Sequence, residues 1–381
     1  MKKTIGKISD VCKVFAGQSP KGTSYNENCL GMEFHQGKKA FGDFFLGKSN
    51  VWTTEITTTA EPGDILMSVR APVGPTNITQ RKICIGRGLA AIRCREKVIP
   101  SFVLYALKNI ENKIEGNNGA VFNSINKKMI EKLPIPIIGK DEQQRIVTYL
   151  DSTFAKIDAV AKNAEKSLND AKALFQSALT KMMEPKEGWE EKKLGDITCK
   201  ITDGSHNPPK GVEHSGFMML SSKNIRNDRF TFDNPRYLSK TDFEKENLRT
   251  DIEKGDVLLT IVGAGLGQCC VYPKEFKVVF QRSAAVIKPR RSEIDNRFLM
   301  YSLQNEYENI REKSNGAAQK GIYLSQLAKY VLSLPSLTTQ QSIVSTLDSL
   351  KSKVDQLQSN LTRTLSECAA LKQSILRETF E

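Results

Sequence analysis

The longest regular pattern of apolar positions lies in 141–183, where small and large apolar residues recur at alternating spacings of three and four. Its members are Phe154, Ile157, Ala161, Ala164, Leu168, Ala171, Phe175, Ala178 and Met182. A second pattern of the same period closes the chain and consists of Leu350, Val354, Leu357, Leu361, Thr364, Cys368, Leu371 and Ile375. A mean period of 3.5 residues is typical of coiled-coil helices. The sequence therefore predicts two long helices, each about 60 Å long at a rise of 1.5 Å per residue.

Each long helix follows a block of mixed pattern. Short apolar runs at 64–69 and 256–261 have the composition of buried strands, whereas 102–110 and 296–307 have the spacing of helices. Prolines, which cannot continue a preceding element, close the two blocks at Pro134, Pro136 and Pro335. This mixture predicts the α+β class.

The chain contains the same unit twice. EPGDILMSVRAPVG, which starts at residue 61, is matched by EKGDVLLTIVGAGLG, which starts at residue 253. The helical ends agree best, with DEQQRIVTYLDSTFAKIDAV from 141 and TTQQSIVSTLDSLKSKVDQL from 338. The centres of the blocks agree least. We therefore divide the chain into two globular domains, 1–136 and 185–335, which are followed by helical segments 137–184 and 336–381.

A tandem repeat of this kind can fold back on itself. We expect the two long helices to pair antiparallel and to relate the two domains by a pseudo-two-fold axis. The alternative is that each helix packs only on its own domain.

The distribution of charge favours a polyanionic partner for the globular domains. The net charge is +13, with +9 in 1–136, +4 in 185–335 and 0 in each helical segment. No stretch approaches the roughly 20 apolar residues that span a bilayer, so we expect a cytoplasmic protein without membrane contact. The eight cysteines form no C-x-x-C pair, which indicates neither a disulfide framework nor a zinc site.

Motifs that resemble catalytic sites are incomplete. Asn207-Pro208-Pro209 resembles the N-P-P-Y motif of adenine-N6 methyltransferases, but Lys210 stands where an aromatic residue would stack on the base. The run 263–267 is rich in glycine without the G-x-G-x-x-G spacing, and we interpret it as a structural or DNA-facing loop. The three histidines have no metal-ligand spacing, and Walker and G-x-S-x-G motifs are absent. The sequence therefore favours a binding protein without its own cofactor or metal.

Three features, two of them repeated, together point to a family. These are G-D-[IV]-L in each globular domain, a D-G-S-H-x-P-P turn from 203, and a proline-closed exit into a Q-Q-x-I-V helix. In this combination the whole chain resembles the specificity subunit of Type I restriction-modification systems. The family commonly carries glutamate before the glutamine at the second helix entry, where this chain has Thr339.

The resemblance implies two target-recognition domains that each read one half of a bipartite DNA site, with the paired helices setting the gap. It also implies a subunit that is not itself an enzyme. Its partners would be double-stranded DNA, two methyltransferase subunits and, for cleavage, two restriction-translocase subunits. S-adenosylmethionine, ATP and Mg would belong to those partners.

We select candidate DNA-binding residues from the polar loops, because arginine suits guanine and asparagine or glutamine suits adenine in the major groove. In the first domain these are Gln18, Ser19, Lys21, Arg70, Asn77, Arg81 and Arg87. In the second they are His206, Lys210, Lys223, Asn224, Arg226, Gln281, Arg282 and Lys320. Two alternatives to a specificity subunit stay open: a coiled-coil scaffold whose basic domains bind nucleic acid without sequence preference, and a stand-alone methyltransferase.

Overall fold

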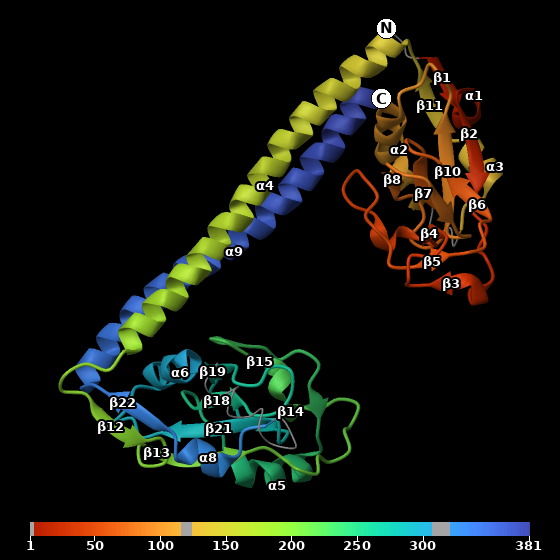
Figure 1. Cartoon of the computed structure of the whole chain (residues 1–381). Coiled ribbons are helices and arrows are strands. Elements are labelled where there is room, and N and C mark those ends of the chain that lie inside the picture. The colour runs from red at the N-terminus through yellow and green to blue at the C-terminus, as the bar shows by residue number, and fades with distance from the viewer. Residues whose placement is uncertain (1–3, 116–123, 307–320) are drawn as a thin grey trace. The chain divides into compact units, whose positions relative to one another are not determined.

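The computed structural model describes residues 4–115, 124–306 and 321–381, and it contains two compact units (Figure 1). Unit 1 comprises Met1–Glu165 and Leu361–Glu381, and unit 2 comprises Lys166–Asn360. Both boundaries fall inside the long helices, α4 (Lys140–Met183) and α9 (Leu337–Phe380). Each unit therefore holds one globular block and a part of each long helix, and the division into four sequence segments stays a prediction.

Unit 1 is built on two sheets. The first has the order β2 (Cys12–Ala16), β10 (Leu89–Cys94), β7 (Ile65–Ser68), β8 (Thr76–Ile78). The second has the order β3 (Tyr25–Asn26), β5 (Trp52–Thr53), β4 (Met32–His35), β9 (Ile83–Ile85), β6 (Thr58–Ala60), with β4 parallel to β9. A separate ladder joins β1 (Thr4–Lys7) to β11 (Pro134–Ile137), and the helices are α1 (Ile8–Val11), α2 (Pro100–Glu115) and α3 (Lys127–Glu131).

Unit 2 repeats this plan. Its four-stranded sheet has the order β13 (Thr198–Asp203), β21 (Ala284–Pro289), β18 (Val257–Thr260), β19 (Cys269–Val271). Its second sheet has the order β17 (Arg236–Tyr237), β14 (Met218–Leu220), β20 (Val279–Phe280), with β14 parallel to β20. Two further ladders join β15 (Ile225–Arg226) to β16 (Arg229–Phe230) and β12 (Glu190–Lys193) to β22 (Val331–Leu334), and the helices are α5 (Lys240–Thr250), α6 (Asn296–Asn305) and α8 (Leu324–Ala328).

The two units agree with the sequence predictions for single elements. The strand-like runs at 64–69 and 256–261 form β7 and β18, and the helical stretches form α2 and α6. The strands of the two four-stranded sheets are arranged in the same spatial order relative to their order in the sequence, which confirms the duplication. The mixture of sheets and helices confirms the α+β class.

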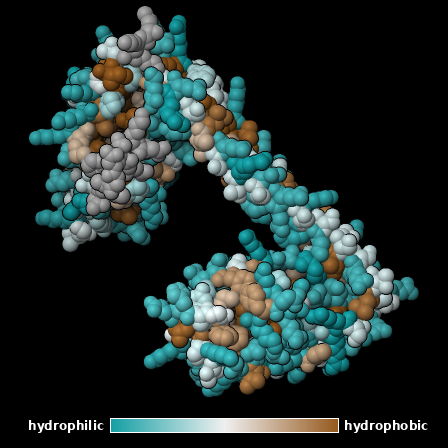
Figure 2. Space-filling model, turned by 180° about the vertical axis from the view of Figure 1, so that it is seen from behind, coloured by the Kyte–Doolittle hydropathy of each residue, from teal (hydrophilic) through white to brown (hydrophobic). Residues whose placement is uncertain are grey.

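The main core of each unit lies between its four-stranded sheet, α2 or α6, and the long helices. Figure 2 shows a mainly hydrophilic surface on the visible face of both units. Among the described residues, no helix combines the length and the apolar character needed to cross a membrane.

The G-D-[IV]-L motif forms the turn that leads into β7 and β18. Its glycine has a positive φ, 89° at Gly63 and 93° at Gly255, a conformation that is strained for residues with a Cβ. Its buried aspartate, Asp64 or Asp256, accepts a 2.8 Å hydrogen bond from the backbone N–H three residues earlier. The motif is thus a structural turn, with the glycine setting the backbone and the aspartate closing it.

A buried glutamine fixes the start of each long helix. Gln143 is 5% exposed and Gln340 is fully buried. Each side-chain oxygen accepts a hydrogen bond from the backbone just before α2 or α6, 2.9 Å from Ile99 N and 2.8 Å from Asp295 N. Each side-chain nitrogen donates to the carbonyl five residues earlier, at 3.0 and 2.9 Å. The first glutamine of Q-Q-x-I-V therefore ties three chain segments together in both units.

The apolar seam of α4 is confirmed, because all nine predicted positions are buried or half-buried. The prediction for α9 is wrong at two positions: Leu357 is 38% exposed and Leu371 is 51% exposed. The last turns of α9 instead bury Leu376 and Phe380. The ring centres of Phe380 and of Phe102 in α2 lie 5.5 Å apart. Packing against the globular core therefore replaces the coiled-coil seam at this end of α9.

Within unit 1 the two long helices run antiparallel. The Cys368 thiol lies 3.9 Å from the carbonyl oxygen of Ile157, and four residues further along α9 the ammonium of Lys372 lies 5.4 Å from the ring centre of Phe154. Residue numbers rise on one helix as they fall on the other. The alternative in which each helix packs only on its own domain is therefore excluded for this unit.

Pro134 and Pro136 do not simply precede the helix, as the sequence suggested. They lie inside β11, opposite Lys7 and Ile5 of β1. Alternate residues of a strand direct their backbone groups to the same side, and proline has no N–H to donate. The two prolines therefore occupy the strand positions that require no ladder donor.

An ion pair between the buried Glu33 and the half-buried Arg81 stabilises the second sheet of unit 1. Arg81 donates to both carboxylate oxygens of Glu33, at 2.5 and 2.6 Å. Burial alone would raise the pKa of Glu33, but hydrogen bonds from Arg81, the Ser49 backbone and His35 outweigh it and lower the pKa to about 2.

Glu33→Gln should lower the free energy of unfolding by about 2 kcal/mol at pH 7. Because the pKa of Glu33 falls from 4.5 unfolded to about 2 folded, its contribution is complete above about pH 4.5 and is lost as the pH falls toward 2. Urea unfolding across this range should show the gap between wild type and variant closing. The exposed Glu27→Gln is the control, and a pH-independent gap would contradict the assignment.

Gln143→Ala and Gln340→Ala should each lower unfolding stability by about 1–3 kcal/mol, because buried backbone groups lose their partners. Gln144, the exposed next residue, donates only to Thr148 Oγ1 at 3.4 Å and provides the matched control Gln144→Ala. Denaturant unfolding of the three variants measures the difference. Equal losses at Gln143 and Gln144 would show that the buried amide has no special role.

Candidate nucleic-acid interface

Two loops meet at one end of the four-stranded sheet of unit 1. The segment after β2 and the turn between β9 and β10 are joined by hydrogen bonds from Gly17 N to Leu89 O, at 2.9 Å, and from Gln18 N to Ile85 O, at 3.1 Å. Arg87 N also donates to Ser19 Oγ at 3.2 Å. The structure thus brings together the candidates Gln18, Ser19 and Arg87.

Glycine permits this close approach. A Cβ on Gly17 would lie 2.2 Å from the carbonyl oxygen of Gly86, and one on Gly88 would lie 2.1 Å from that of Gln36. Backbone atoms cannot give way at such distances. The turn that carries the exposed Arg87 is therefore held between two other backbone segments.

Arg70 and Lys21 lie in segments adjoining this turn. Val69 N donates to Gly88 O at 3.0 Å, which places the exposed Arg70 next to the turn of Arg87. Lys21 is exposed at the end of the first loop. Five of the seven candidates of the first domain therefore belong to one group of loops.

The other two candidates of the first domain are held in contacts within the protein. Asn77 is fully buried and donates to Gly42 O at 2.7 Å, so it presents no surface to DNA. Arg81 is held by Glu33 and by the carbonyl oxygen of Leu46, at 3.1 Å. We withdraw both from the candidate set.

The same arrangement occurs in unit 2. Ser205 N donates to Phe280 O at 2.7 Å, and Arg282 N donates to Ser205 O at 2.9 Å. A Cβ on Gly204 would lie 2.1 Å from Phe280 O, so Gly204 has the role of Gly17. Arg282 accordingly occupies the exposed turn position that Arg87 has in unit 1.

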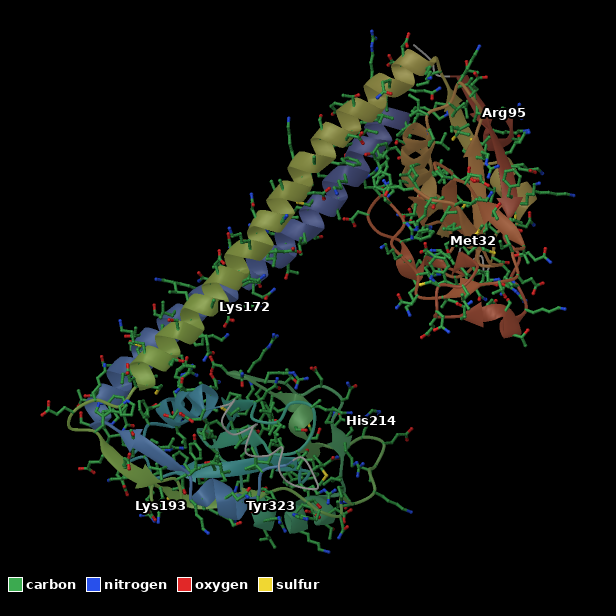
Figure 3. All side chains as sticks on the ribbon, viewed as in Figure 1. Met32, Arg95, Lys172, Lys193, His214 and Tyr323 are labelled. Carbon is green, nitrogen blue, oxygen red and sulfur yellow. The ribbon has the colours of Figure 1, made fainter. Side chains whose placement is uncertain are left out.

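His206 and Lys210 extend the first loop of unit 2. The His206 imidazole lies 2.7 Å from Asp203 Oδ2, and its side chain is half exposed. Asp203 also accepts a hydrogen bond from Arg249, so the carboxylate that supports His206 is itself held. Lys210 is exposed further along the same loop, in which Figure 3 labels His214.

A pocket of about 560 Å³ adjoins this turn. Lys223, Arg226 and Gln281 line it together with Arg236, which the sequence analysis missed. Arg236 donates to Pro209 O at 2.9 Å and comes from the edge strand β17. Asp233 also lines the pocket, but three cationic side chains outnumber it and, with the amide of Gln281, can donate to phosphate oxygens or base edges.

Asn224 lines the same pocket but has a structural role. It is 3% exposed, its Oδ1 accepts from Ser221 N at 3.0 Å, and its Nδ2 donates to Asp233 O at 2.9 Å. We withdraw it as well. Lys320 lies outside the described residues.

Lys38 and Lys39 were also missed. They lie in the short 3-10 turn Lys38–Ala40 after β4, and the turn Ser222–Asn224 with Lys223 follows β14 in the same way. Both lysines of the first turn are exposed. The sequence matches between the repeats did not extend to these segments, and their correspondence follows only from the parallel pairing of β4 with β9 and of β14 with β20.

The glycine-rich run 263–267 is a hairpin turn. Thr260 N donates to Gln268 O and Gly267 N to Thr260 O, both at 2.8 Å, and the chain then enters β19. A phosphate-binding loop would instead lead into a helix. Within the described residues, no group of three or more His, Cys, Asp or Glu side chains could hold a metal ion.

The family of the Type I restriction modification DNA specificity domain matches this chain twice, over residues 2–169 and 186–366. A protein of Methanocaldococcus jannaschii named for the specificity subunit of type I restriction enzyme MjaX is 40% identical over 170 residues, 44% of this chain and 40% of that protein. The specificity subunit of type I restriction enzyme EcoBI from Escherichia coli is 22% identical over 350 residues, 84% of this chain and 73% of that protein. The match to the first relative thus spans less than half of its length.

Two solved structures share the fold. A chain described in work on complex assembly and conformational transition of the type I R-M system superposes with a TM-score of 0.78 at 19% identity, covering 100% of this chain and 98% of that one. The HsdS subunit from Thermoanaerobacter tengcongensis superposes with a TM-score of 0.55 at 20% identity, covering 99% and 96%. The likeness at these identities concerns the fold alone, but the family match covers both repeats. The chain belongs to the Type I restriction modification DNA specificity domain family.

Proposed function

We propose that this chain is the sequence-specificity subunit of a Type I restriction-modification enzyme and acts in the cytoplasm on double-stranded DNA. It is not itself an enzyme. Each globular block reads one half of a bipartite site, and the chain carries two methyltransferase subunits and, in the full complex, two restriction-translocase subunits. S-adenosylmethionine, ATP and Mg belong to those subunits.

One observation carries the proposal: the same group of loops occurs in both units, with an exposed arginine on the same turn and different side chains around it. The loop joined to the turn of Arg87 carries Gln18 and Ser19, whereas the corresponding loop joined to the turn of Arg282 carries Ser205 and His206. A common backbone suits two readers of the same kind. Different side chains suit two different half-sites.

The long helices support a fixed gap between the half-sites. We infer that α4 and α9 pair antiparallel along their length and relate the two blocks by a pseudo-two-fold axis. The contacts of Ile157 with Cys368 in unit 1 and of Lys172 with Gln358, at 3.1 Å, in unit 2 support this pairing. Helices of this kind resist compression, so the number of base pairs between the half-sites becomes a property of the chain.

The lysines and arginines of the loops supply affinity through phosphate contacts, which makes binding salt-dependent. Of the original candidates, we retain Gln18, Ser19, Lys21, Arg70, Arg87, His206, Lys210, Lys223, Arg226, Gln281 and Arg282, and we add Lys38, Lys39 and Arg236. The buried Asn77 and Asn224 are left out, and so is Arg81, whose guanidinium is bound to Glu33.

Arg87→Ala and Arg282→Ala should each relax one half of the methylated motif and leave the other half unchanged. Loss of a base contact costs about 1–3 kcal/mol of discrimination. Genome-wide mapping of methylated sites in cells with the complete methyltransferase complex measures this for each half. Arg95→Ala is the control, because Arg95 lies at the other end of β10 and donates to Ser9 O (Figure 3). Equal methylation of unrelated sequences by the wild-type complex would overturn the proposed function in favour of binding without sequence preference.

Exchange of residues 1–136 for the first domain of another family member should change one half of the motif only. The reason is that unit 2 and both helix-entry glutamines stay in place. The same methylation mapping gives the new half-site and the gap. A change in both halves would contradict independent reading by the two domains.

A further inference from the structure

A two-residue hairpin carries Arg226 at the pocket of unit 2. Its strands β15 and β16 pair Arg226 with Arg229, and the turn between them is Asn227-Asp228, with a φ of 57° at Asp228. Arg226 lines the pocket of about 560 Å³. Its guanidinium donates to the carbonyl oxygen of Ile225 in the same hairpin, at 2.8 Å, so its position depends on how the hairpin is held.

The sheet holds the turn from one side. Asp228 N donates to Cys269 O at 3.0 Å, and Cys269 N donates to Asn227 Oδ1 at 3.2 Å. These bonds fix the backbone of the turn to β19. They do not involve the carboxylate of Asp228, whose side chain is 12% exposed.

Arg297 holds the turn from the other side. Its Nη2 lies 3.1 Å from an oxygen of the Asp228 carboxylate. The same guanidinium donates to Asp348 Oδ1 of α9 from Nε at 2.9 Å and from Nη2 at 2.6 Å. One side chain of α6 thus joins the hairpin to the long helix.

The surroundings keep the Arg297 side chain in place. Tyr301, one turn further along α6, donates its hydroxyl to Asp348 Oδ1 at 2.7 Å, and the Arg297 guanidinium lies 5.6 Å from the Tyr301 ring centre. A planar guanidinium that contacts two carboxylates and a ring has few alternative positions. The Arg297 side chain can therefore hold the hairpin at a fixed position relative to α9, in addition to neutralising the charge of the two carboxylates.

Unit 1 shares only a part of this arrangement. Tyr105 donates to Asp151 Oδ1 at 2.6 Å, as Tyr301 does to Asp348. Ser101 stands at the position of Arg297, four residues before the tyrosine. The tyrosine–aspartate contact therefore belongs to the repeated scaffold, whereas the arginine bridge distinguishes unit 2.

We propose that Arg297 is a positioning residue for DNA recognition: it fixes the β15–β16 hairpin, and with it Arg226, relative to α9, and so determines how selectively the second half-site is read. This inference rests on the proposed function. Burial raises the pKa of Asp228, and the positive charge of Arg297 opposes that rise. Without Arg297 the buried carboxylate of the turn loses its ion-pair partner, and the hairpin loses its connection to the long helix.

The test uses the complete methyltransferase complex with Arg297→Met, Arg297→Lys or Asp228→Asn, and maps methylated sites in the genome. Arg297→Met and Asp228→Asn should lower discrimination at one or more positions of the second half by about tenfold, and leave the first half unchanged. Arg297→Lys should recover part of the discrimination, because it keeps the charge without the planar fork. Arg290→Met is the matched control, since it removes another arginine of unit 2, whose guanidinium lies 3.8 Å from Glu293 and outside the bridge; its motif should be that of the wild type.

The results separate the inference from the proposed function. A wild-type complex that methylates no bipartite motif overturns the proposed function. A wild-type complex with a bipartite motif that Arg297→Met and Asp228→Asn both retain, or that they relax equally in both halves, overturns the inference alone. If Arg297→Met does not assemble, Asp228→Asn decides, because it leaves the bond between Arg297 and Asp348 in place.

Discussion

A buried amide at the entry of each long helix fixes the helix to its globular core. Gln143 and Gln340 each join the helix start to the backbone that precedes α2 or α6. This fixes the rotation of the long helix about its axis where it leaves the globular core. Two turns later the same rotation brings Asp151 and Asp348 to the tyrosines of α2 and α6. Within each unit, the long helix, the globular core and the loops at the far end of the sheet therefore have fixed positions relative to one another.

The two units share this scaffold but differ in the side chains of the loops that we propose to contact DNA. The loops are joined mainly by backbone hydrogen bonds, which require glycine at Gly17, Gly88 and Gly204 but place few demands on the other side chains. The loop side chains can therefore change without loss of the loop geometry. The Arg297 bridge of unit 2 is an addition to the shared scaffold, because Ser101 takes its place in unit 1.

The sequence predicted the features that have a local pattern. The duplication, the strands at 64–69 and 256–261, the helices and the seam of α4 follow from periodicity and self-similarity. Leu371 was misassigned because the period continues along α9 while its packing partner changes. Asn77 was predicted to lie in a loop, because its hydrogen bond to Gly42, 35 residues away, cannot be inferred from the neighbouring sequence. Arg236 was missed because it lies in a strand of only two residues, Arg236–Tyr237, which is too short to show a pattern in the sequence.

The prolines of β11 affect the tendency of unit 1 to associate with other chains at high concentration. Pro134 and Pro136 leave the outer side of this edge strand with carbonyl acceptors and without N–H donors at those positions. A foreign strand could form only half of a ladder there, so edge-to-edge aggregation is disfavoured. The corresponding strand of unit 2, β22, has Val331 and Ser333 in place of the prolines, with Val331 48% exposed, and lacks this protection against self-association.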